Sequence, residues 1–211
     1  MLDLQLKNNG EKKMTKIKAG SIIKFGNINW LVLEVQGDRA LIITKDVMEP
    51  RQYDDNDDDQ TWETCALRKY LNNDFFDRFS YDEKNMIIGT DIINNDNLWY
   101  NTSGGYSTFD KIFLLSIDEA EKYFGGSADY VNKNRKNFKG VNDNSGAYLS
   151  NSNDKKRAAK FGGKLSALWW LRSPGSNSNK AAKVAANGSI LVIGEKFSEM
   201  APFRPALWLK V

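Results

Sequence analysis

The order in which strand-like and helix-like patterns follow one another constrains the fold of this chain most. The stretch 21–48 alternates apolar and polar residues and contains Gly26-Asn27 and Gly37-Asp38, two pairs that suit tight turns, which predicts a β-meander. Helix-like patterns follow, and strand-like patterns return over 181–194 and 206–211. Strands at both ends without β–α–β alternation predict an α+β fold with antiparallel sheets, two to three helices and long loops. We expect the first and last strands to share one sheet.

The segments between these strands carry helix signals. The segment 61–79 has apolar residues at steps of four, as on one face of a helix: Leu67, Leu71, Phe75 and Phe79. Ser-x-x-Glu motifs at 80–83 and 116–119 predict two further helix starts through capping boxes. The stretch 111–115 predicts a short strand, and 125–165 predicts a long loop, which is typically functional or mobile. A type I′ turn is expected at Asn187-Gly188 in the C-terminal hairpin.

The length of the chain fits one domain. At 211 residues with 41% hydrophobic residues, the chain can bury a sizeable core. Residues 1–16 are polar and show no pattern, so we expect a flexible N-terminal tail. The domain itself is expected to cover residues 17–211.

Two absences limit the chemistry. The sequence has no histidine and only one cysteine, Cys65, which excludes an internal disulfide, a Cys/His zinc site and a Ser-His-Asp or Cys-His nucleophile within this chain. Acid–base work would fall to Asp, Glu, Lys or Tyr, and no pair of them stands out at a useful spacing. We therefore expect that the protein is not an enzyme and that it binds no cofactor and no metal.

The charge pattern argues against nucleic acid as a partner. The net charge is only +3, and basic residues are mixed with acidic ones instead of forming a stripe. No segment is apolar enough for a signal peptide or a transmembrane helix, so we expect a cytoplasmic or virion-associated protein without membrane contact.

An acidic run over 54–59 allows two interpretations. Its aspartates could supply oxygen ligands to calcium, although the run lacks the spacing of an EF-hand loop. Runs of charge are more often simply solvated, and Asp59 could instead lie near the start of the following helix. Both alternatives stay open at the level of sequence.

The motif WWLRSPG at 169–175 and the closing segment FRPALWL at 203–209 carry the largest side chains of the C-terminal half. On a strand, Trp169 and Trp170 point to opposite faces, and packing is the favoured role for at least one ring over ligand contact. Arg172 shares the face of Trp170, where its guanidinium could stack on the indole. Arg172 and Arg204 are expected to hydrogen-bond buried carbonyls or a carboxylate, with an anion site as the alternative.

These motifs carry a resemblance. Together with TWETCALRKYLNNDFF at 61–76 and KIFLLSIDEAEKYF at 111–124, they resemble an uncharacterised family of bacterial and phage domains over about residues 17–211. That family is similar in layout to C-type-lectin-like folds, including formylglycine-generating-enzyme-like domains and variable proteins diversified by retroelements. The resemblance implies a C-type-lectin-like single domain. The enzyme branch uses a cysteine pair, which this chain lacks.

The favoured function is a non-catalytic binding or display module that presents loops to a protein, glycan or small ligand. Loops 142–155 and 176–180 are rich in Asn and Ser, residue types that adaptable binding surfaces use. One alternative is a phage or bacterial factor that sequesters a small ligand in a Trp/Arg-lined pocket. Another is an enzyme relative without the cysteine pair. The candidate ligand-binding residues are Trp170, Arg172, Ser176, Asn177, Asn179 and Arg204.

Overall fold

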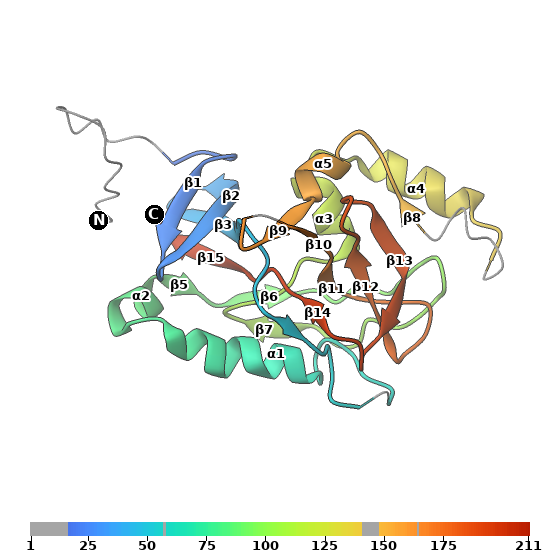
Figure 1. The fold of residues 1–211 in the computed structure, drawn as a ribbon, viewed down its shortest axis with the longest axis horizontal. Coiled ribbons are helices and arrows are strands. Elements are labelled where there is room, and N and C mark those ends of the chain that lie inside the picture. The colour runs from blue at the N-terminus through green and yellow to red at the C-terminus, as the bar shows by residue number, and fades with distance from the viewer. Residues whose placement is uncertain (1–16, 57, 141–147, 164) are drawn as a thin grey trace.

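The computed structural model describes residues 17–56, 58–140, 148–163 and 165–211. The chain forms helices and antiparallel sheets in a mixed arrangement, which confirms the α+β class (Figure 1). The predicted tail 1–16 and residues 142–147 of one predicted loop lie outside the described residues.

The largest sheet joins the two ends of the described chain. Its order is β1-β2-β3-β15-β5, with bounds Ile22–Phe25, Ile28–Gln36, Arg39–Thr44, Ala206–Lys210 and Ile87–Ile88. The first three strands are the predicted meander, and Gly26 and Asn27 have φ of 57° and 59°, as a type I′ turn requires. β15 lies between β3 and β5, so the first and last strands share a sheet as expected.

A second sheet contains the WWLRSPG motif. Its order is β11-β12-β13-β8, with bounds Trp169–Pro174, Lys180–Val184, Ile190–Lys196 and Tyr148–Leu149. The predicted β12–β13 hairpin is confirmed, but its type I′ turn is wrong. A type I′ turn needs positive φ at both central residues. Among the described residues other than glycine, only Asn27 and Asn101 have positive φ, so Asn187 does not fit that turn. Its side chain accepts a hydrogen bond from Ser189 N (3.0 Å), and Gly188 alone takes the left-handed conformation at φ 93°.

Three short antiparallel ladders connect these sheets. β4 (Pro50–Arg51) pairs with β14 (Ala201–Pro202), and β6 (Thr90–Ile92) pairs with β7 (Thr108–Asp110). β9 (Ala159–Phe161) pairs with β10 (Leu165–Ala167).

The described residues hold five α-helices instead of the two to three expected. They are α1 (Ala66–Tyr70), α2 (Tyr81–Met86), α3 (Ile117–Tyr123), α4 (Ala128–Asn137) and α5 (Asp154–Arg157). The additional helices, α4 and α5, lie in 125–165, where a long loop was predicted. Ser127 caps α4 by accepting a hydrogen bond from Tyr130 N (3.2 Å), a start signal hidden in a polar stretch.

The helix that begins at α1 continues through one π-helical turn (Leu71–Phe75) and one 3-10 turn (Phe76–Arg78). Its predicted apolar stripe is confirmed, because all four side chains are buried: Leu67, Leu71, Phe75 and Phe79. The Asn72 amide lies in the π-helical turn. It donates to Arg68 O (3.1 Å) and Ile112 O (2.9 Å), and it accepts from Lys111 N (2.8 Å), which fastens the helix to the segment at 111–112.

Both predicted capping boxes are confirmed, at Ser80/Glu83 for α2 and at Ser116/Glu119 for α3. The predicted strand 111–115 is wrong: only Phe113 pairs, in an isolated bridge to Ala206. β5 pairs with Trp208 and Leu209 of β15, and the segment 111–115 meets the same strand only at Ala206.

One continuous core lies between the sheets and helices. Its largest members have 0–1% exposed area: Trp30, Trp62, Trp169 and Trp170. None of the helices in the described ranges has the length and apolar character needed to cross a membrane.

Candidate functional site

β11 forms the buried frame of the candidate site. All of its residues are buried, and Trp169 and Trp170 have no exposed area. The indole of Trp170 donates to Arg51 O (2.9 Å), and that of Trp169 donates to Arg157 O (3.3 Å). Both rings are thus enclosed with their N–H groups paired, an arrangement that favours packing over ligand contact.

Arg172 is held in an internal ion pair. Its guanidinium contacts both carboxylate oxygens of Glu119 and donates to Leu114 O (2.8 Å) and Ile93 O (3.2 Å). Glu119 is also the capping residue of α3, so this pair connects β11 to α3. Burial would raise the pKa of Glu119, but the nearby charge and hydrogen bonds of Arg172 hold that pKa below its ordinary value.

The cation over the Trp170 ring is Lys183, whose ammonium lies 4.6 Å from the ring centroid. The proposed stacking of Arg172 on Trp170 is wrong, because a register shift between Trp170 and Pro174 interrupts the regular alternation of the strand. The Arg172 guanidinium instead lies 6.0 Å from the Phe113 ring.

Arg204 belongs to a different part of the core. Two of its nitrogens donate to Thr44 O (3.0 and 2.8 Å), and its guanidinium lies 5.0 Å from the Trp169 ring. Burial lowers its pKa to about 10, so it stays protonated near neutral pH. Its partners are distinct from those of Arg172, and the structure does not bring these two predicted site residues together.

Three aromatic side chains pack around the end of β11. Tyr53 stacks on Phe197 with 4.9 Å between ring centroids, and its ring lies 6.2 Å from that of Trp62. The Tyr53 hydroxyl donates to Arg172 O (3.0 Å), and the Trp62 indole donates to the buried carboxylate of Asp110 (2.8 Å). We call Tyr53, Trp62 and Phe197 the aromatic floor.

Three loops converge over the aromatic floor, and we call them together the three-loop surface: 58–62, 94–107 and 176–180. Gln60 N donates to Ser178 O (3.1 Å), and the Ser178 hydroxyl bonds the carboxylate of Asp59. A Cβ on Gly105 would lie 2.7 Å from Thr61, which shows how closely loop 94–107 approaches loop 58–62. Loops that are distant in the sequence thus form one continuous rim.

Asn97 anchors loop 94–107. This residue is 1% exposed, and its side-chain amide lies within hydrogen-bonding distance of Pro174 O (2.9 Å), Gly175 O (3.2 Å) and Val192 O (2.8 Å). Its carbonyl oxygen accepts from Trp99 N (3.1 Å). One buried side chain therefore fixes the loop to β11 and β13.

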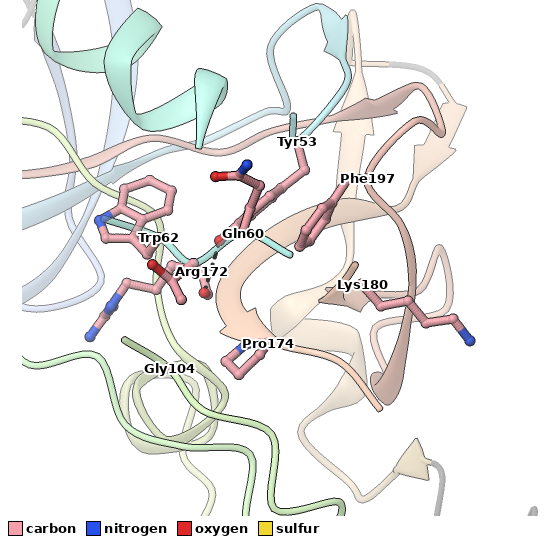
Figure 2. A pocket seen from close by; sticks show the side chains of 9 residues that line it. Tyr53, Gln60, Trp62, Gly104, Arg172, Pro174, Lys180 and Phe197 are labelled. Carbon is pink, nitrogen blue, oxygen red and sulfur yellow. Dashed lines mark hydrogen bonds between the residues drawn. The ribbon is translucent and has the colours of Figure 1, made fainter. Parts of the chain in front are cut away.

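Figure 2 shows the depression between these loops and the aromatic floor. Arg172 and Lys180 point in opposite directions there, so the guanidinium does not meet the ammonium across an open space. About 0 Å³ of the depression can admit a water-sized group. Small-ligand pockets usually enclose about 300–1,000 Å³, so this depression is a surface feature and not a pocket.

The remaining predicted site residues lie on the rim. Asn177 is exposed, and Ser176 and Asn179 are half-buried. The Ser176 hydroxyl bonds Asn177 Oδ1 (3.1 Å), and the buried Asn179 Oδ1 has no hydrogen-bond partner. These three residues follow the end of β11, the strand that contains Trp170 and Arg172.

The other predicted loop, 142–155, does not join this surface where it is described. Residues 148–149 pair with 190–191, close to the β12–β13 turn, whereas loop 176–180 precedes the opposite end of β12. Asn151 instead bonds Glu121 (3.2 Å) in a buried cluster with Arg157. Residues 148–149 and loop 176–180 therefore lie towards opposite ends of the sheet.

The acidic run supports the fold at one position. The buried Asp54 carboxylate accepts from Ala66 N (2.7 Å) at the start of α1, the role suggested for Asp59, while Asp59 bonds Ser178. Asp57 lies outside the described residues. Within the part of the chain that is described, no group of three or more acidic, histidine or cysteine side chains could hold a metal ion.

Sequence reasoning missed loop 94–107 and the aromatic floor. The loop, NNDNLWYNTSGGYS, is rich in Asn and Ser, as loops 142–155 and 176–180 are, and also contains Gly and Tyr, so its composition could have indicated it. The floor residues gave no such signal, because aromatic side chains mostly pack in cores.

The single thiol is unsuited to catalysis. Cys65 caps the N-terminus of α1, is fully buried and accepts from Arg68 N (3.4 Å). Burial raises its pKa to about 12, so the reactive thiolate is scarce at neutral pH.

The antiparallel sheets and helices define the protein as a mixed α+β domain that carries the three-loop surface. Residues 37–211 match the family described as Domain of unknown function (DUF6273), and the chain belongs to this family. This agrees with the resemblance to an uncharacterised domain family. No curated protein and no solved structure matches the chain significantly.

Proposed function

We propose that this protein is a non-catalytic binding module that recognises a protein or glycan partner with its three-loop surface. The observation that carries the proposal is the mutual fixation of the loops. The bases of the loops are held by Asn97 and by the bonds of Ser178 to Asp59 and Gln60. The outer side chains of the loops are exposed, among them Asp58, Tyr106 and Asn177. Pre-organised loops lose less conformational freedom on binding, which favours affinity.

The shape of the surface favours a macromolecular partner over an enclosed small ligand. The depression over the aromatic floor admits about 0 Å³ of water-sized groups, and Arg172 is already paired with Glu119. These observations support a macromolecular partner over the alternative in which Trp170 and Arg172 line a sequestering pocket. The enzyme alternative would have to rely on groups other than Cys65, because burial raises the pKa of that thiol to about 12.

A C-type-lectin-like layout is part of the proposal. It is supported by the terminal strands, which share the five-stranded sheet, and by the long loops beside the second, C-terminal sheet. In this layout the buried strands β11 and β15 support the domain, and the loops present the binding surface. The proposal extends to a bacterial or phage origin, with a cytoplasmic or virion location.

The test uses two tyrosines of equal exposure. Tyr106 on loop 94–107 is 79% exposed, and Tyr81 on α2 is 80% exposed. Partners are captured from extracts of the cells that naturally make the protein, with wild type, Tyr106→Ala/Asn177→Ala and Tyr81→Ala as baits. We expect the double variant to bind its partner about tenfold more weakly or worse, since exposed tyrosines are frequent interface anchors.

Tyr81→Ala should retain the partner at the wild-type level, and all three baits should melt at similar temperatures because the substitutions are at the surface. A partner that binds the double variant as tightly as wild type would sink the proposal. An equal loss with Tyr81→Ala would sink it too.

A further inference from the structure

A second concave site lies outside the three-loop surface and is lined by residues of β4, of the start of α1 and of the segment just before β14. This cleft has a volume of about 380 Å³, within the usual range for small-ligand sites. Its lining includes charged, aromatic and apolar side chains: Glu49, Arg51, Asp55, Leu67, Tyr70 and Met200. We call it the Arg51 cleft.

Arg51 is held in this cleft by ring and main-chain contacts, with one long ion pair to Glu49. Its guanidinium lies over the Tyr70 ring, 3.5 Å from the centroid, and its main chain is fixed by pairing with Ala201 and by the bond from Trp170 Nε1 (2.9 Å). Among the described residues its buried Nε has no hydrogen-bond partner, and it lies 3.9 Å from Glu49 Oε1 in a long ion pair. A held guanidinium with unused donors suits a planar carboxylate.

The other charges near Tyr70 are already balanced. Glu49 accepts from the Tyr70 hydroxyl (2.7 Å) and from Arg78 (2.8 Å). Arg78 thus makes the closer ion pair with Glu49, and Arg51, whose side chain is 43% exposed, keeps nitrogen donors that a ligand can reach. The exposed Asp55 lines the same cleft and offers a carboxylate to a cationic group.

The apolar part of the lining completes the match. Leu67 is buried and forms part of the wall, whereas Met200 is 63% exposed at the cleft and has an adaptable side chain. A ligand with one carboxylate, one ammonium group and an apolar side chain would use all three kinds of surface.

We propose that the Arg51 cleft binds a small zwitterion of the free α-amino acid class, with its carboxylate on Arg51 and its ammonium group towards Asp55. The three-loop surface is not involved, so this site can exist whether or not the proposed function is correct. A peptide terminus shares part of this chemistry, and the experiment separates the two.

The experiment is ligand-observed NMR of the whole protein with the twenty proteinogenic L-amino acids at millimolar concentration. Any amino acid that binds is compared with its amide, which lacks the carboxylate, and with its N-acetyl form, which lacks the ammonium group. We expect binding of at least one amino acid with an apolar side chain, and about tenfold or weaker binding of both derivatives, since each loses one charged contact.

Two cleft variants and a matched control locate the binding. Arg51→Gln and Asp55→Asn should each weaken binding by about tenfold or more. Arg39 stacks on Trp208 at 4.5 Å in the five-stranded sheet, in the same way as Arg51 stacks on Tyr70, so Arg39→Gln should bind as wild type does.

Three results overturn the proposal: no amino acid binds the folded wild type, binding survives Arg51→Gln, or the amide binds as well as the free amino acid. Tight binding of the N-acetyl form alone also overturns it, because that result would assign the cleft to a peptide C-terminus. Circular dichroism confirms that each variant is folded before binding is compared.

Discussion

At the scale of single residues, Trp169 and Trp170 show how two neighbours on one strand serve different parts of the core. Trp170 contacts Tyr53 and Lys183, while Trp169 lies beside Arg204 and bonds Arg157 O. Alternation along the strand, read from the sequence, predicts this division. The hydrogen-bond partners could not be predicted, because Arg51 and Arg157 are distant in the chain.

Replacing either tryptophan should destabilise the fold strongly. Trp169→Ala and Trp170→Ala are each expected to cost about 3–5 kcal/mol of unfolding free energy, because a fully buried indole leaves a large cavity and an unpaired carbonyl. Denaturant titration of each variant measures the loss. A cost below about 1 kcal/mol would show that the ring is not part of the core.

The Arg172–Glu119 pair should make stability depend on pH. The folded pKa of Glu119 is lowered, so its stabilisation is present above the unfolded value of 4.5 and disappears as pH falls through the lower folded pKa. The stability difference between wild type and Glu119→Gln should therefore be largest near neutral pH and shrink in acid. Glu83→Gln is the control, since Glu83 has the same capping role at Ser80. A difference that stays constant with pH would contradict the assignment.

Cys65 should be chemically silent in the native protein. Because burial raises its pKa to about 12, we expect no reaction with Ellman's reagent at neutral pH until the chain is unfolded by denaturant. Stoichiometric labelling of folded protein would contradict this burial and would reopen a catalytic role for the thiol.

At the scale of elements, local signals were reliable where they depend on neighbours in the sequence. Both capping boxes and the turn at Gly26-Asn27 need only a few adjacent residues, and all three were predicted correctly. The strand at 111–115 was wrong because its pairing depends on what else occupies the edge of β15. Competition of this kind is not encoded in periodicity.

The two capping serines offer a matched comparison. Ser116→Ala should cost about 1–2 kcal/mol, because Ser116 is 5% exposed and water cannot easily replace its bond to Glu119 N. Ser80 is exposed, so Ser80→Ala should cost only about 0.5–1 kcal/mol. Thermal unfolding of both variants gives the order, and a larger loss at Ser80 would contradict the difference in burial.

At the scale of the whole molecule, the site depends on contacts between distant segments. Asn97 reaches carbonyl groups 77, 78 and 95 residues further along the chain, and Gln60 meets Ser178. The sequence indicated Ser176, Asn177 and Asn179 from composition alone. It could not show that loop 94–107 lies beside them, or that Arg204 and the loop at 148–155 lie elsewhere.

Asn97→Ala should loosen the three-loop surface as a unit. Its removal leaves the carbonyls of Pro174, Gly175 and Val192 without this donor. We expect the free energy of unfolding to fall by about 2–3 kcal/mol. Amide hydrogen exchange should accelerate in 94–107 and 176–180 together, while the five-stranded sheet is unchanged. Acceleration confined to 94–107 would show that the loops are not coupled.

The most direct test of the binding role is hydrogen exchange on the protein alone and in complex with the partner recovered from its own cells. If the three-loop surface is the recognition site, the partner slows exchange in 58–62, 94–107 and 176–180, which are separate in the sequence. Slower exchange elsewhere, with all three loops unchanged, would contradict it.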